Sequence, residues 1–277
     1  MRAELADKKQ RNMLRKFPLA SFFILSYLFF LAAILLIGAI VSMASVSAIA
    51  MGMLIALASW TPNFSALVVI GITEGRVGVR QLFAGWTRWR VNAWWYLFGL
   101  SPIVIAFLIA WVYLLAGTAV TPKISIELSF SPFFLMLFFH TIQGATGEEL
   151  GWRGFALPRL QSRFSPLVSA LILGLIIAGW HGILHVVSPA GIPEWQFLIL
   201  MVSYSVIITW AYNKSRGSLL IVTLFHFAFN FSLDLVCSGL ALIPLEKLFA
   251  LRTAVYTLCA IALIIITGKN LSKERKS

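Results

Sequence analysis

Long runs of apolar residues dominate the chain, and short polar segments separate them. A membrane-spanning helix needs about 20 predominantly apolar residues, whereas a transmembrane barrel shows alternating segments of about ten residues. Eight apolar stretches are long enough to be candidate spans: 17–41, 45–72, 92–116, 129–147, 165–187, 195–213, 217–236 and 248–267. The pattern therefore predicts an all-α, polytopic integral membrane protein with about eight transmembrane helices.

The second of these stretches contains Trp60-Thr61-Pro62. A proline inside a helix removes one backbone hydrogen bond and clashes with the preceding turn. The sequence therefore predicts a kink or a break at this point.

Composition agrees with a chain surrounded by a lipid bilayer. Of the 277 residues, 60% are hydrophobic and 12% are charged, and the mean hydropathy is +0.91. A soluble domain carries about 25% charged residues. We expect a single membrane domain over 1–277, with 1–16 as a cytoplasmic N-terminal tail and 268–277 as a cytoplasmic C-terminal tail.

Basic residues gather in alternate loops, which is the positive-inside pattern. The chain holds 22 Lys and Arg against 10 Asp and Glu, a net charge of +12. The expected outer side receives only Lys123, Lys247 and Arg252. The bias predicts both termini in the cytoplasm, and in a bacterium it predicts the plasma membrane. Basic residues placed in this way give no reason to expect nucleic-acid binding, and the oligomeric state is not predicted.

Ionisable side chains at membrane depth are costly, so each one is a candidate for function. The four histidines all lie between positions 140 and 226, and the acidic pair Glu148-Glu149 lies in the same interval. We interpret His140 as structural because no motif surrounds it, and we favour a structural role for His185 as well.

The acidic pair lies in a helix that also carries Arg153. Glu149 and Arg153 are four residues apart with the acid first, the favoured order for an ion pair. Glu148 is turned about 100° from Glu149 around the helix. Arginine can therefore neutralise one carboxylate while its neighbour points elsewhere. Repulsion and a low dielectric would raise one pKa, which suits a carboxylate that takes a proton from water.

Glycines recur at steps of three and four through the same segment, so they are expected to share one face of a helix. Small residues on one face allow another helix to approach closely. These glycines are Gly144, Gly147, Gly151 and Gly154.

Two further pairs of polar residues are spaced by one helical turn. His181 and His185 could bind a metal, but HExxH is absent from the sequence, which excludes the standard zincin pattern; we favour His181 for the site. His226 and Asn230 could donate hydrogen bonds to a developing oxyanion, or they could join helices by hydrogen bonds. We expect the three motifs to converge at one site open to the cytoplasmic side.

Taken together, these motifs resemble the CPBP intramembrane proteases, the CAAX-processing and bacteriocin-processing enzymes. The marks of that family are Glu-Glu-x-x-x-Arg, Phe-x-x-x-His and His-x-x-x-Asn/Asp within about eight spans. Glu148-Glu149 with Arg153 match the first mark, and His226 with Asn230 match the third. His181 matches the second only in part, because Ile177 replaces the phenylalanine. The segments 60–62 and 88–90 also resemble bacterial members.

The resemblance implies hydrolysis of a peptide bond in a peptide or protein substrate at the membrane. It implies that Glu148 and His181 activate water and that His226 and Asn230 polarise the carbonyl. Glu149 and Arg153 would order the site. It also implies Zn²⁺ held by Glu148, His181 and His226, although the same residues suffice for general-base chemistry without a metal.

Two other functions remain open at this point. Some members of the family confer bacteriocin self-immunity or act as scaffolds, so a non-catalytic immunity or scaffold protein is one alternative. A proton-coupled transporter is the other, since buried His and Glu residues can relay protons. A transporter is expected to show internal repeats, and none stands out in the sequence.

Overall fold

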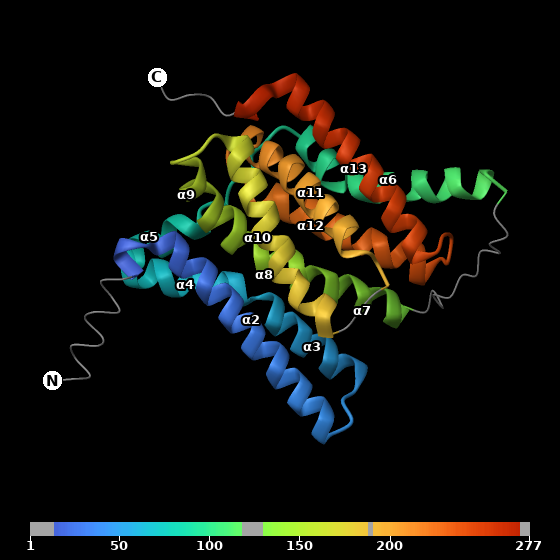
Figure 1. Cartoon of the computed structure of the whole chain (residues 1–277), viewed down its shortest axis with the longest axis horizontal. Helices are drawn as coiled ribbons and strands as arrows, with labels where there is room; N and C mark the ends of the chain where they lie inside the picture. Colours follow the sequence, from blue (N-terminus) through green and yellow to red (C-terminus); the bar gives the residue numbers. More distant parts are fainter. Residues whose placement is uncertain (1–13, 118–129, 188–190, 272–277) are drawn as a thin grey trace.

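The computed structural model describes residues 14–117, 130–187 and 191–271 (Figure 1). Every regular element in these ranges is helical, and seven helices in them are long and apolar enough to cross a membrane. They are α2 (Pro18–Met43), α3 (Ala48–Ser59) continued by α4 (Thr61–Thr73), α6 (Trp94–Leu115), α10 (Pro166–Val187), α11 (Glu194–Lys214), α12 (Leu219–Asp234) and α13 (Leu245–Thr267). The predicted all-α, polytopic class is confirmed.

Shorter helices connect these spans. They are α5 (Gly75–Phe83), α7 (Phe130–His140), α8 (Thr146–Glu149) and α9 (Leu157–Gln161). A π-helical stretch, Leu150–Ala156, joins α8 to α9, and another, Leu235–Gly239, extends α12. A 3₁₀ turn, Gly268–Asn270, follows α13.

The fourth predicted span, 129–147, differs from the others because it is not one continuous helix. Its first residue lies outside the described ranges, and α7 ends at His140. The backbone leaves helical geometry at Gln143, where ψ is 177°, and at Gly144, where φ is 35°. Such a positive φ favours glycine. The break explains why seven spans, rather than eight, are found in the described part of the chain.

The predicted break at Trp60-Thr61-Pro62 is confirmed. Helix α3 ends at Ser59 and α4 begins at Thr61, with Pro62 in its first turn. Proline is tolerated there because the first turn of a helix does not use its backbone N–H groups. The Trp60 indole donates to the carbonyl oxygen of Ile142 at 2.6 Å, and Gln143 Nε2 donates to the Gly52 carbonyl at 3.0 Å. The two helix breaks are therefore tied to each other.

The prediction that four glycines share one helix face is wrong for Gly144, because the helix is interrupted there. The others do permit close approach. A Cβ atom on Gly147 would lie 2.8 Å from Trp60, one on Gly154 would lie 3.2 Å from Leu82, and one on Gly151 would lie 2.6 Å from backbone atoms of Pro62. The turn that bears the two glutamates thus packs closely on the start of α4.

Helices α10, α11 and α12 lie in the middle of the bundle, with α2, α3 and α4 on one side and α6 and α13 on the other (Figure 1). Helix α10 packs on α11, α12 on α6, α11 on α13 and α2 on α4. Buried aromatic side chains join α2 to the site-bearing segments, since Trp152 contacts both Phe22 and Trp180, and Trp180 contacts Phe30. The acidic turn is therefore held inside the bundle.

The outward faces of the spans are apolar, as lipid contact requires. Leu35 and Leu36 on α2, and Ile265 and Ile266 on α13, are at least 61% exposed. The cytoplasmic location of both termini stays a prediction, and residues 1–13 and 272–277 lie outside the described part of the chain.

The close approach at Gly151 leads to a stability prediction. Replacing Gly151 with alanine places a methyl group against the Pro62 backbone, and overpacking of this kind costs about 1–3 kcal/mol. Gly71→Ala is the matched control on α4, because a Cβ atom there meets nothing within 4 Å. We expect Gly151→Ala to lower the thermal unfolding midpoint in mild detergent and Gly71→Ala to leave it unchanged or raise it. Equal midpoints for the two variants would contradict the packing.

Candidate active site

The carboxylate of Glu149 is buried and accepts hydrogen bonds from two side chains. Arg153 Nη1 donates to Glu149 Oε1 at 3.0 Å, and His226 Nδ1 lies 2.7 Å from the same oxygen. Glu149 has no exposed area, and Arg153 is 1% exposed. The ion pair of Glu149 with Arg153 is the one that their spacing predicts. Because α8 carries Glu149 and α12 carries His226, this carboxylate joins two elements of the fold.

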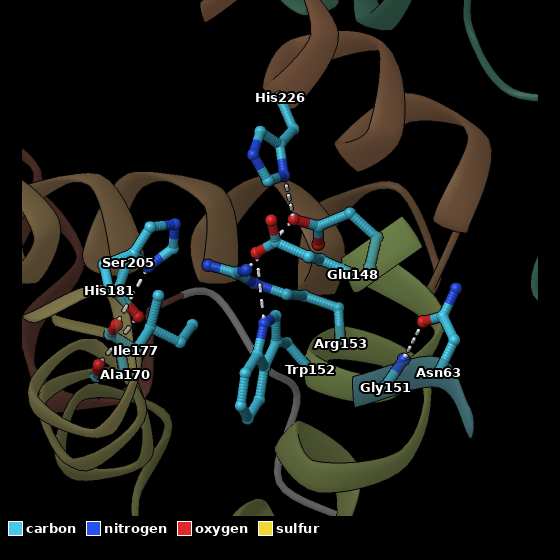
Figure 2. Close-up of polar contacts among 11 residues, drawn as sticks. Asn63, Glu148, Gly151, Trp152, Arg153, Ala170, Ile177, His181, Ser205 and His226 are labelled. Carbon is cyan, nitrogen blue, oxygen red and sulfur yellow. Dashed lines mark hydrogen bonds and ion pairs between the residues drawn. The ribbon is translucent and has the colours of Figure 1, made fainter. Parts of the chain in front are cut away.

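Glu148 has a different hydrogen-bond partner from Glu149. Its Oε2 accepts from the Trp152 indole at 3.2 Å, whereas Arg153 donates to Glu149 (Figure 2). Residue 148 lies outside the seven candidate spans. Burial raises the pKa of the Glu148 carboxyl from 4.5 to about 7, and the adjacent Glu149 charge also raises it, while His226 acts in the opposite direction. A carboxyl group with this pKa changes its protonation state near neutral pH.

Three polar atoms converge beside Gly144. A Cβ atom built on Gly144 would lie 2.8 Å from Asn230 Nδ2, 3.3 Å from His226 Nε2 and 3.6 Å from Glu148 Oε1. The three side chains therefore surround one point, and the missing side chain of Gly144 leaves room there. Glycine at this position serves both the helix break and the approach of these groups.

His181 reaches the same region from α10. Its Nδ1 lies 2.9 Å from the Ile177 carbonyl oxygen, one turn earlier in the helix. A carbonyl oxygen only accepts, so Nδ1 carries the hydrogen and Nε2 is the acceptor of the neutral ring. The contact uses the backbone of Ile177, so it does not depend on a phenylalanine at this position. In Figure 2 His181 lies to one side of Glu148 and His226.

A cavity of about 160 Å³ brings these residues together. Its lining includes Glu148, Arg153, His181, His226 and Asn230, and most of the remaining lining residues are apolar. Glu149 is not among the lining residues. The predicted convergence of the three motifs is therefore observed, with Glu149 behind the cavity wall.

Asn63 on α4 holds the acidic turn in place, and sequence reasoning missed it. Its Nδ2 donates to the Thr146 carbonyl at 2.7 Å, and its Oδ1 accepts from the Gly151 N–H at 2.9 Å. The two bonds bracket Glu148 and Glu149, and Figure 2 shows the bond to Gly151. Asn63 directly follows the Trp60-Thr61-Pro62 segment, and this position beside a predicted helix break was the signal in the sequence that could have identified it.

Tyr204 on α11 is a second residue that sequence reasoning missed. It lines the cavity, and its ring packs edge-on against His226 at 5.8 Å between centroids. Its hydroxyl is buried and has no hydrogen-bond partner in the described protein. A polar hydroxyl in an apolar helix was the only signal for it in the sequence.

His140 lies apart from this cluster. His140 Nε2 is 2.9 Å from Asp234 Oδ2, which joins α7 to the end of α12. His140 is not among the cavity-lining residues, in agreement with a structural role. The side chain of His185 lies outside the described side chains.

The zinc site that the resemblance implies was compared with the geometry of these residues. Within the described ranges, no three His, Cys, Asp or Glu side chains are grouped so that they could hold a metal ion. Zn²⁺ held by Glu148, His181 and His226 stays a prediction, and we derive no step through a metal.

The fold and the site define a polytopic membrane protein whose helices enclose a cluster of acid, histidine and asparagine side chains. Residues 130–232 match the family model described as "Type II CAAX prenyl endopeptidase Rce1-like". The match covers all of the motif residues named above.

A curated relative supports the same family. CAAX prenyl protease 2 from Methanococcus maripaludis is 32% identical over 182 residues, which is 62% of this chain and 65% of that protein. The chain therefore spans slightly less than two thirds of that relative's length. The chain is therefore similar, over residues 130–232, to the Rce1-like type II CAAX prenyl endopeptidases.

The buried ion pair leads to a second stability prediction. Arg153→Met leaves the Glu149 charge without its guanidinium, and breaking a buried pair costs about 3–5 kcal/mol. We expect the double variant Glu149→Gln/Arg153→Met to be more stable than Arg153→Met alone, because no unpaired carboxylate remains. Arg163→Met is the control, since Arg163 is exposed and surface substitutions stay within about 0.5 kcal/mol. Unfolding in detergent measures all three, and a double variant no more stable than Arg153→Met would contradict the assignment.

Proposed function

We propose that the chain is an intramembrane endopeptidase that hydrolyses a peptide bond with water activated by Glu148 and His181. The observation that carries this proposal is the convergence of Glu148 Oε1, His226 Nε2 and Asn230 Nδ2 within 3.6 Å of one point. A general base and two oxyanion donors are the groups that amide hydrolysis by water requires. Similarity to a family of proteases over residues 130–232 supports the same chemistry.

The water is activated on the side of the cavity formed by Glu148. A carboxylate whose pKa is about 7 is a stronger base than an ordinary glutamate, yet it is ionised in a large fraction of molecules at neutral pH. Nε2 of the neutral His181 ring supplies a second acceptor, which orients the attacking water.

The oxyanion forms on the opposite side, beside His226 and Asn230. Asn230 Nδ2 is a donor in every protonation state. His226 donates from Nε2 only when both ring nitrogens carry hydrogen, because Nδ1 already donates to Glu149.

The bonds and protons of the reaction balance with these groups alone. The water oxygen bonds to the carbonyl carbon while Glu148 takes one water proton, and the carbonyl electron pair becomes the oxyanion. As the oxyanion collapses, the C–N bond breaks, and the proton held by Glu148 passes to the leaving amine. The products are a new carboxyl group and a new amine.

The name of the curated relative suggests the substrate. That protein is called a CAAX prenyl protease, so we propose a membrane-associated substrate of the CAAX type. The apolar cavity lining supports a peptide with apolar side chains at the cleavage site. A prenylated CAAX peptide is therefore the first probe, and the same peptide without the lipid is its companion.

The activity test uses the purified protein in nanodiscs and a fluorogenic prenylated CAAX peptide. We expect wild-type protein to cleave it, and we expect Glu148→Gln and His226→Ala to lower kcat by about 10²–10⁴-fold, the range for losing a general base or an oxyanion donor. His140→Gln is the control histidine variant and should keep wild-type activity. Unchanged thermal midpoints would show that the inactive variants remain folded.

Two results would overturn the proposal. Full activity in purified Glu148→Gln protein would remove Glu148 from the reaction. Absence of cleavage of both peptides, together with rescue of a deletion phenotype by Glu148→Gln, would favour the non-catalytic immunity or scaffold function. Proton-coupled flux in liposomes that is lost in His226→Ala would favour the transporter.

A further inference from the structure

Arg252 is a buried cation that the hydrolysis reaction described above does not use. The distribution of basic residues along the sequence places it on the outer side of the membrane. In the structure it lies in the second turn of α13, is 2% exposed and lines the same cavity as Glu148 and His226. The cavity therefore holds two arginines, of which only Arg153 is paired with a carboxylate.

The guanidinium of Arg252 is fixed by α12. Nη2 donates to the Phe229 carbonyl oxygen and to Ser232 Oγ, the latter at 3.1 Å. The guanidinium carbon, Cζ, lies 3.7 Å from the centre of the Phe229 ring, so the planar guanidinium stacks on that ring. Both hydrogen bonds come from Nη2, so the N–H groups of Nη1 are not used by these two bonds. The guanidinium is thus held in one orientation before any ligand arrives.

Within the described chain, no carboxylate forms an ion pair with Arg252. Burying a charge is costly unless an opposite charge or several hydrogen bonds compensate it. A guanidinium forms strong, charge-assisted hydrogen bonds to the oxygens of a carboxylate. An unpaired guanidinium on the wall of a substrate cavity therefore suits an anionic group of the substrate.

The position along α12 indicates which anionic group this is. Phe229 and Ser232, which hold Arg252, lie three and six residues beyond His226. At about 1.5 Å per helical residue, this separation is roughly 5–9 Å along the axis. An extended peptide advances about 3.3 Å per residue. The guanidinium is therefore about one to three peptide residues from the scissile bond.

The cavity wall in this region is apolar. Phe197, Leu200, Met201, Leu233 and Phe249 all contribute to it. The side chains between the scissile bond and the anionic group would then be apolar as well. A short apolar segment that ends in a carboxylate is the C-terminus of a peptide.

We propose that Arg252 binds the free α-carboxylate at the C-terminus of the peptide substrate and thereby selects a scissile bond a few residues from the chain end. This assignment rests on the proposed function. It makes Arg252 a specificity-determining residue. It also makes the free chain end, in addition to any lipid, a requirement for cleavage.

The test compares two prenylated peptides of the same sequence, one ending in a free acid and the other in an amide. Each is cleaved by the wild-type protein, by Arg252→Lys and by Arg252→Gln in nanodiscs, and kcat/KM is measured for all six pairs. A hydrogen-bonded charged group gives roughly tenfold to hundredfold discrimination. We expect wild-type protein to prefer the acid by that factor. Arg252→Lys should keep part of the preference and Arg252→Gln should lose it, mainly through slower cleavage of the acid.

The acid-to-amide ratio separates this role from a structural one. If Arg252 only held α12 through Phe229, its replacement would slow cleavage of both peptides by the same factor, and the assignment would be overturned. Equal cleavage of acid and amide by the wild-type protein would overturn it without any variant, so the test survives a variant that does not fold. If the wild-type protein cleaved neither peptide, the proposed function would be overturned, and this assignment with it.

Discussion

The geometry of the site depends on one buried oxygen, Oε1 of Glu149. It accepts hydrogen bonds from Arg153 on the same turn and from His226 on α12. A carboxylate without exposed area persists only when it is paired and hydrogen-bonded in this way. The interaction fixes the ring of His226 and pairs the charge of Glu149 with Arg153, while Glu148 lines the cavity. Two adjacent residues of the same type thus have different surroundings.

The acidic turn can occupy this place because the chain is broken on both sides of the contact. The corner at Trp60-Thr61-Pro62 brings Trp60 to the carbonyl of Ile142, and Asn63 then holds the backbone on both sides of the glutamates. At Gly144 the positive φ turns the chain away from the α7 axis. A continuous fourth helix could not bring Gly144 beside His226 and Asn230. The interrupted span is therefore a requirement of the site.

Much of the fold and part of the site could be predicted from sequence, since these features depend on local spacing. Apolar run length predicts the spans, and the separation of Glu149 from Arg153 by one turn predicts their ion pair. Long-range contacts were not predictable in this way. The break after Ile142 is stabilised by Trp60, about eighty residues earlier. Charge counting does not reveal the contacts with α12 that bury Arg252. No rule of spacing connects such partners.

The hydrogen bond from His226 Nδ1 to Glu149 is the central claim, and ¹⁵N NMR of histidine-labelled protein tests it most directly. Single substitutions of the other three histidines assign the His226 signals. We expect Nδ1 to carry a hydrogen in the wild-type protein and its signal to shift in Glu149→Gln, where a neutral amide replaces the charged acceptor. An Nδ1 atom without hydrogen in the wild-type protein would contradict the account, because Glu149 could then not orient the ring.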